Sequence, residues 1–259
     1  VLATSPEQQT GGTRGLQGGG AAPGDMDDIF YINISSTGNA QSWGDLGNNL
    51  RDHGSGQAGS ATRGVFPNNY NPYTTSDGIA YISLTSTGNA SDFGNLTQSK
   101  ANTANHSSSI RAVFAGGFNA SDQTVDDLDY VTIASTGNAS DFGALGVSRK
   151  QFGGLGSTTR GVFGGGQGSA TIRYITIAST GDGTGFGDLT VGRRYMGSGS
   201  NNTRGVWGGG NSSGRVNTID YVTIASAGNA TDFGDLSGTR ENPSAVSGPT
   251  RTVFAGGEE

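Results

Sequence analysis

Short segments in which apolar and polar residues alternate recur along this chain. The clearest is YVTIAS, which begins at Tyr221, and related segments begin at Tyr31, Tyr81, Tyr130 and Tyr174. Alternation with a period of two residues indicates strands with one face toward a core. No stretch shows the apolar stripe of an amphipathic helix. The pattern therefore predicts an all-β chain built from short strands.

Other marks recur in register with these tyrosine strands. An octapeptide, TRGVFGGG at 159–166, has variants whose second residue is Arg14, Arg63, Arg111, Arg160, Arg204 or Arg251. These arginines are 49, 48, 49, 44 and 47 residues apart. Each tyrosine strand is followed by an aromatic residue and glycine, at Trp43, Phe93, Phe142, Phe186 and Phe233. A basic residue precedes each later octapeptide, at Arg51, Lys100, Arg149, Arg193 and Arg240. Repeats of this length are typical of β-propeller blades.

Each repeat is expected to contain four strands. In the clearest repeat they are predicted at about 151–157, 159–164, 173–178 and 186–190. Turns of the type STGNASDF join the last two, and their Gly and Asn residues tolerate the backbone of a tight hairpin. The sequence thus predicts one five-bladed propeller over 1–259, with repeats at about 13–50, 51–99, 100–148, 149–192 and 193–239, and a terminal half repeat at 240–259.

The sixth octapeptide exceeds what five blades need. Either the terminal strands overlap and close the ring, or they complete a sheet in a neighbouring copy of the chain. Closure is favoured because the first octapeptide, TRGLQGGG, lacks the aromatic residue found at Phe163.

Composition argues against several classes of function. The chain has 48 Gly, 14% charged residues, a net charge of -6 and no Cys, which excludes disulfides, thiolate metal sites and a cysteine nucleophile. Basic residues are not clustered, so neither nucleic acid nor an anionic membrane is an expected partner, and no apolar run is long enough for membrane insertion. His53 and His106 match neither a catalytic triad nor a metal cluster. We expect no enzyme activity, no metal and no cofactor.

The repeated arginines allow two interpretations. In a radial fold the six octapeptide arginines become a ring of cations, which could hold an anion or a sugar acid. The candidate binding residues among them are Arg63, Arg111, Arg160 and Arg204. Alternatively, each guanidinium clamps acidic or carbonyl groups of the next blade, and this structural role is favoured. The glycines of the octapeptide are not expected to bind phosphate, because no helix follows them. Their expected role is to leave the sheet without side chains where neighbouring blades pack closely.

Aromatic residues supply a second group of candidates. If the protein is lectin-like, sugar rings could stack on Trp43, Trp207, Tyr70 and Tyr73. The two tyrosines belong to VFPNNYNPYTTSDG at 65–78, where one repeat departs from the others. Such departures are where function is often added to a scaffold.

The order of these marks resembles the kelch repeat of β-propellers. VFGGG at Val162, VWGGG at Val206 and VFAGG at Val113 are each followed by a tyrosine, then an aromatic residue, a leucine and a basic residue. Segments such as IDYVTIASAGNATDFGDL at 219–236 also resemble Gly/Asn/Thr-rich propeller proteins of tailed bacteriophages, especially marine and cyanobacterial phages.

That resemblance implies a virion or extracellular location and a structural or attachment role, as a phage tail, fibre or decoration component. The implied partners are other virion proteins or the host surface. Two alternatives stay open: a lectin-like propeller that binds a host surface glycan, and a self-assembling extracellular structural protein.

Overall fold

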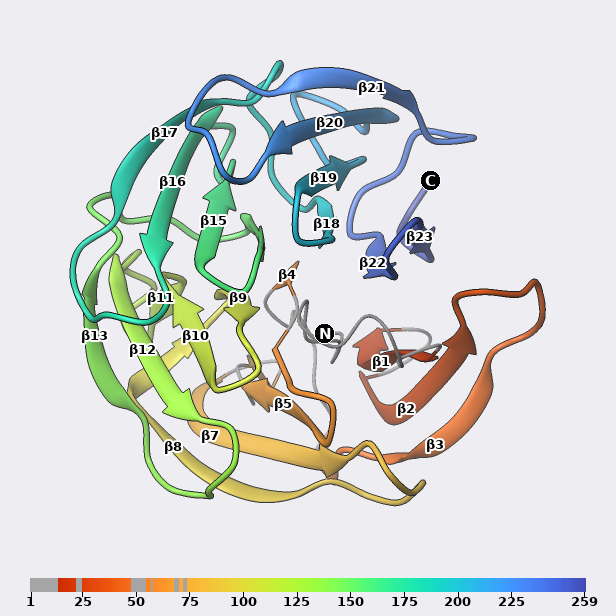
Figure 1. The fold of residues 1–259 in the computed structure, drawn as a ribbon, viewed down its shortest axis with the longest axis vertical. Helices are drawn as coiled ribbons and strands as arrows, with labels where there is room; N and C mark the ends of the chain where they lie inside the picture. Colours follow the sequence, from red (N-terminus) through yellow and green to blue (C-terminus); the bar gives the residue numbers. More distant parts are fainter. Residues whose placement is uncertain (1–13, 22–24, 48–54, 57, 68–69, 72–73) are drawn as a thin grey trace.

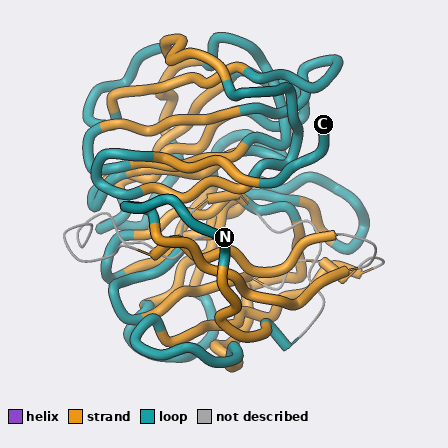
Figure 2. The backbone as a smooth tube through the Cα atoms, turned by 90° about the vertical axis from the view of Figure 1, so that its right-hand side faces the viewer, coloured by secondary structure: helices purple, strands orange, loops and turns teal. Residues whose placement is uncertain are grey.

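The computed structural model describes residues 14–21, 25–47, 55–56, 58–67, 70–71 and 74–259. Within these ranges the chain is all-β and forms a five-bladed β-propeller, with its sheets arranged in a ring (Figure 1). Figure 2 views the ring from the side on which β2 and β23 lie, and shows strands joined by loops. The described residues include no helix of the length and apolar character that crossing a membrane requires.

The fourth blade shows the repeat in its simplest form. Its innermost strand is β14 (Gly153–Gly156), followed outward by β15 (Arg160–Gly164), β16 (Thr171–Thr176) and β17 (Thr184–Asp188). Each strand is antiparallel to the next. The four strands predicted for this repeat are confirmed, with their ends shifted by one or two residues.

The other blades follow the same order. The third blade contains β9 (Ala104–Ser107), β10 (Arg111–Ala115), β12 (Asp127–Thr132) and β13 (Ser140–Ala144). The fifth contains β18 (Gly197–Ser200), β19 (Arg204–Gly208), β20 (Thr218–Thr223) and β21 (Thr231–Asp235). The described strands of the first are β1 (Arg14–Ala21), β2 (Asp25–Asn33) and β3 (Gln41–Asp45).

The second blade is the least regular. It contains β5 (Arg63–Pro67), β7 (Thr74–Ser83) and β8 (Ser91–Ala101), and Gly59 bridges to Gly64 on its inner side. Two short strands are added: β6 (Tyr70–Asn71) pairs with β7, and β11 (Phe118–Asn119) pairs with β8.

The terminal half repeat forms a separate sheet of β22 (Ser244–Ser247) and β23 (Thr252–Ala255), called the half blade below. It lies between β18 of the fifth blade and β1 of the first (Figure 1). Val246 packs in the same apolar cluster as Leu16 and Trp43. A Cβ at Gly15 would lie 2.0 Å from a Val246 methyl carbon, so the half blade approaches β1 closely. The half blade thus packs between the fifth and the first blade through side chains, as a sheet separate from that of β1.

A segment that the repeat pattern did not predict lies at the centre of the ring. β4 (Ser55–Gly56) pairs in parallel with β9 and also approaches β14 and β18. A Cβ at Gly56 would lie 1.9 Å from the carbonyl oxygen of Asn105, and Gly56 has a φ of 123°. Only glycine fits this approach.

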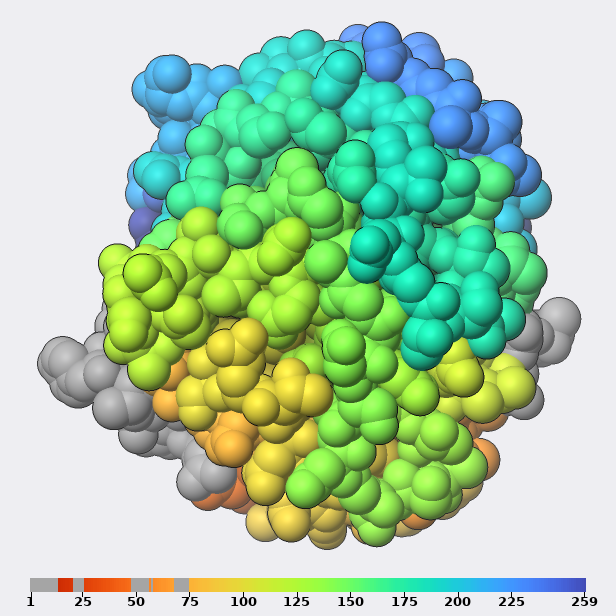
Figure 3. All heavy atoms as spheres, turned by 90° about the vertical axis from the view of Figure 1, so that its left-hand side faces the viewer, coloured from red at the N-terminus to blue at the C-terminus, as the bar shows by residue number. Residues whose placement is uncertain are grey.

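Apolar side chains fill the space between neighbouring blades. Phe186 of β17 packs with Val222 and Ile224 of the fifth blade, and its ring meets that of Tyr174 edge to face at 6.0 Å. Alternation along each strand thus puts apolar residues into the contacts between sheets. Figure 3 shows the side formed by the third and fourth blades, where the atoms make a continuous surface.

Candidate binding surfaces

The octapeptide arginine and the tyrosine strand meet in every blade. Each guanidinium lies over the ring of the tyrosine in its own blade, an arrangement in which a cation is attracted to the aromatic face. The distances from the guanidinium carbon to the ring centre are 5.2, 4.8, 4.7, 4.6 and 4.4 Å for Arg14, Arg63, Arg111, Arg160 and Arg204.

Three of these arginines also bind the next blade. Arg63 Nη1 donates to the carbonyl of Ile133 at 3.0 Å, and Arg111 Nη1 donates to those of Ile177 and Ala178 at 3.1 and 3.0 Å. Arg160 Nη1 donates to the carbonyls of Ile224 and Ala225 at 3.1 and 2.8 Å. The favoured interpretation, a clamp on the carbonyls of the next blade, describes these three residues. Arg204, on the fifth blade, is exposed.

The two tryptophans do not offer stacking platforms, and here the sequence-based expectation is wrong. Trp43 is 3% exposed and packs in the first interblade cluster, and Trp207 is 0% exposed. Trp207 Nε1 donates to the Gly153 carbonyl at 3.2 Å. Both indoles occupy apolar positions of the repeat and are buried there, so no ring face is open to a ligand. Tyr73 lies outside the described residues, and for Tyr70 only the backbone pairing of β6 is described.

The basic residue before the octapeptide is buried in three blades. Lys100 Nζ lies 2.5 Å from Asp127 Oδ2 and 3.0 Å from Asp129 Oδ2. Arg193 Nη1 lies 2.7 Å from Asp220 Oδ2, and both side chains are 0% exposed. These ion pairs join the end of β8 to β12 of the third blade, and the start of the fifth repeat to β20.

Arg149 occupies the same repeat position with a different set of partners. Its Nη1 donates to the carbonyls of Gly165 and Thr171 at 2.7 and 2.8 Å. Burial, together with the nearby Arg173 cation, lowers the pKa of Arg149 to about 10. Arg149 therefore remains charged at neutral pH, and its role is to hold the ends of two strands together. Arg51, the first such residue in the sequence, lies outside the described residues.

His106 lies on β9, the inner strand of the third blade, and its ring contacts the inner strand of the fourth blade. It is 0% exposed, its Nε2 lies 3.0 Å from the Ser157 carbonyl oxygen, and burial lowers its pKa to about 4. At neutral pH the ring is uncharged and Nε2 donates to that carbonyl. His53 lies outside the described residues, and the described part of the chain brings together no cluster of three metal-binding side chains.

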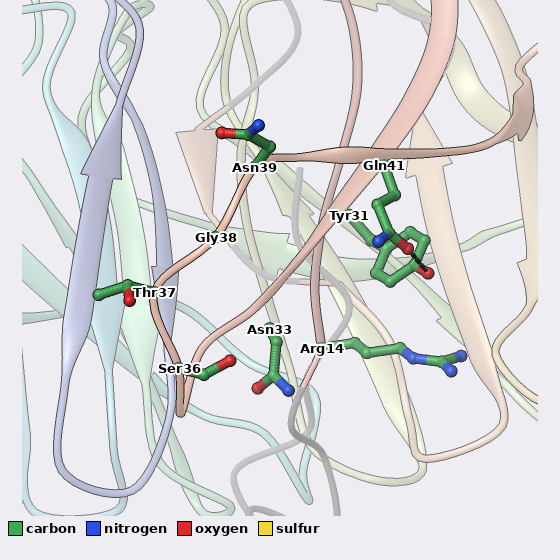
Figure 4. Close-up of a pocket in the computed structure, with 8 residues that line it drawn as sticks. All are labelled: Arg14, Tyr31, Asn33, Ser36, Thr37, Gly38, Asn39 and Gln41. Atoms are coloured by element: carbon green, nitrogen blue, oxygen red, sulfur yellow. Dashed lines mark hydrogen bonds between the residues drawn. The ribbon is translucent and has the colours of Figure 1, made fainter.

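A polar pocket of about 380 Å³ lies on the first blade (Figure 4). Arg14, Tyr31, Asn33 and Gln41 line it together with the turn at 36–39, and the Tyr31 hydroxyl donates to Gln41 Oε1.

Two of these residues depart from the repeat. Asn33 lies opposite Arg14, where the other blades have Ser83, Thr132, Thr176 and Thr223. Gln41 lies opposite Tyr31, where the other blades have Ser91, Ser140, Thr184 and Thr231. The two amides add donors and acceptors to a guanidinium and a tyrosine, a lining suited to a small polar ligand. The repeat pattern did not predict this pocket, although both departures from the repeat can be read in the sequence.

Comparison with known protein families finds no matching family, and comparison with curated proteins finds no match either.

Proposed function

We propose that this chain is a non-enzymatic structural or attachment module of a virion, such as a phage tail, fibre or decoration component, that engages other virion proteins or the host surface. One observation carries the proposal: repeated charged and aromatic side chains are used between blades. Arg63, Arg111 and Arg160 bind carbonyls of the next blade, and Phe93 and Phe142 are buried beside it. Because the repeated arginines and phenylalanines hold neighbouring blades together, the repeats form a rigid scaffold.

The kelch-like order of marks and the phage-like composition of the turns support the virion part of this proposal. The test compares particles assembled with and without the chain, and particles in which the wild-type chain is restored. We expect its removal to lower the yield of particles or their rate of adsorption to cells, and restoration to reverse the loss. Unchanged assembly together with unchanged adsorption would overturn the proposal.

A second candidate function, carbohydrate binding, is favoured by the polar pocket on the first blade. Sugars are bound through several hydroxyl groups, which require both donors and acceptors. The amide nitrogens of Asn33 and Gln41 are donors, and Gln41 Oε1, which accepts from the Tyr31 hydroxyl, can accept a second hydrogen bond, whereas Asn33 Oδ1 already accepts two from Ser35. Arg14 would favour a sugar acid over a neutral sugar.

The matched variants restore the residues that other blades carry, Asn33→Thr and Gln41→Ser. We expect a sugar acid at millimolar concentration to give saturation-transfer NMR signals with the wild-type chain and much weaker signals with the double variant. The absence of signals from a panel of neutral and acidic sugars, or equal signals from both proteins, would exclude this pocket as a glycan site.

A further inference from the structure

The outer strand of the fifth blade differs from its equivalents in burial. The aromatic residue of this strand is 3, 2, 2 and 4% exposed in the first four blades, at Trp43, Phe93, Phe142 and Phe186. In the fifth blade Phe233 is 55% exposed. The half blade beside it consists of β22 and β23, the counterparts of the two inner strands of a blade. In the described structure, therefore, Phe233 lacks the outer hairpin that covers its four equivalents.

The regular blade boundaries show what such a hairpin contributes. Phe186 packs against Val222, Ile224 and Ala230, which come from the tyrosine strand and the turn of the next blade. Between the second and third blades, Phe93 packs in a cluster with Val131 and Ile133, and Ala139 packs against this cluster. The cover thus consists of two aliphatic residues spaced two apart after the tyrosine, and the alanine of the Gly-Asn-Ala turn.

The same turn makes a fixed set of hydrogen bonds. At the fourth boundary Ala230 N donates to the Asp188 carbonyl at 2.8 Å, and Asp188 N donates to Asn229 Oδ1 at 3.1 Å. At the second boundary Ala139 N donates to the Asn95 carbonyl at 2.7 Å, and Asn95 N donates to Asn138 Oδ1 at 3.1 Å. By position in the repeat, Asp235 of the fifth blade is the residue that would make these two bonds.

The space beside Gly234 and the unpaired edge of β23 also indicate that an outer hairpin is missing next to the fifth blade. A Cβ at Gly187 would lie 2.2 Å from the Gly228 carbonyl oxygen of the next blade, whereas a Cβ at Gly234 would meet nothing within 4 Å. β23 pairs with β22 on one side, and within the described residues no strand pairs with its other side. In complete blades that other side binds the tyrosine strand. Unpaired strand edges are templates for strand addition.

We propose that the surface formed by Phe233, Gly234, Asp235 and the free edge of β23 is a docking site for a β-hairpin with the repeat's own pattern, supplied by a segment other than residues 1–259. The pattern required is a tyrosine strand of the type Tyr-Val-Thr-Ile, a Gly-Asn-Ala turn and a strand with an aromatic residue followed by glycine. The chain has five such hairpins, and in the structure all five belong to their own blades. A second copy of residues 1–259 would have to open one of its blades to supply one, so the occupant is a hairpin from outside these residues. This inference does not depend on the chain being a virion component.

The test uses the full chain and a synthetic peptide with the sequence of residues 218–236. Binding is measured by calorimetry at up to millimolar peptide, and its site by hydrogen exchange at Asp235 and β23, with β10 of the third blade as an internal reference. We expect saturable binding and slower exchange at Asp235 and β23. A peptide carrying Val222→Ser and Ile224→Ser should bind at least about tenfold more weakly, because burial of these side chains supplies much of the affinity.

The protein variant Phe233→Ala should weaken binding by a similar factor. Phe30→Ala is the matched control, because Phe30 is 38% exposed on the first blade and should leave binding unchanged. Both residues are exposed, so both variants should fold, which circular dichroism checks. The proposal is overturned if the peptide does not saturate, if Phe233→Ala binds it as wild type does, or if native mass shows a dimer of the chain that protects Phe233 without peptide.

Discussion

Replacing Arg193 by Met tests whether the buried basic residue of the repeat holds a blade together. The Arg193 guanidinium is fully buried, with Nη1 2.7 Å from Asp220 Oδ2 and Nε 2.9 Å from the Gly209 carbonyl oxygen. Methionine is close in length but leaves the carboxylate of Asp220 buried without its cation. Removing one partner of a buried ion pair costs about 3–5 kcal/mol. For a chain of this size that corresponds to a fall in Tm of about 6–20 °C.

The matched control is Arg240→Met, at the same position of the next repeat. Arg240 Nη2 lies 2.7 Å from Glu259 Oε1, but the Glu259 side chain is 74% exposed. Arg240 Nη1 also donates to the Gly256 carbonyl, but this carbonyl belongs to an exposed residue and Glu259 stays solvated, so the variant should lose only about 1 kcal/mol. Urea unfolding followed by tryptophan fluorescence compares the two, and Arg193→Met/Asp220→Asn should recover part of the loss. Equal stability of the two single variants would refute the reasoning.

Three further outcomes follow from the same contacts. Phe186→Ala should lower the free energy of unfolding by about 3–5 kcal/mol, because it opens a cavity in a buried cluster, whereas Phe233→Ala should lower it by less than about 1 kcal/mol. Urea titrations measure both losses, and equal losses would contradict the difference in burial. Because the pKa of His106 is lowered from 6.5 to about 4 in the folded state, the unfolded state binds the proton more tightly between these values, and stability should fall as the pH drops through this window. The loss due to His106 is about 2 kcal/mol between pH 7 and pH 5, and His106→Gln should have a smaller loss over that range by this amount; identical pH profiles would show that the histidine is not buried uncharged. Arg160→Ala should cost about 2 kcal/mol, since it removes two charge-assisted hydrogen bonds and a cation–π contact, and Arg204→Ala less than about 1 kcal/mol; thermal melts of the two variants would contradict this if their order were reversed.

The local pattern of the sequence determined the strands, their order within a blade and the number of blades. Alternation after Tyr174 and the turn chemistry of the repeat depend on neighbours along the chain, so a single repeat carries enough information to place β15, β16 and β17 within one or two residues. Repetition then determined the ring, because each repeat can bury its apolar faces only against another copy. The clamp by the repeated arginines could also be anticipated, since a repeated residue meets the same neighbour at each boundary.

Tertiary structure alone decided which members of each repeated set of residues are buried and which are exposed. Phe186 and Phe233 stand in nearly identical sequences, yet one is buried and the other exposed, because burial depends on the blade that follows and not on the strand itself. The same holds for Trp43 and Trp207. The sequence allowed their indoles either an exposed position for a sugar or a position in the core, and in the structure both are buried in the core. The placement of β4 inside the ring depends on a close approach of Gly56 to Asn105, a contact between segments far apart in the chain. Such long-range contacts are set by the packing of whole sheets, which no local pattern of residues encodes.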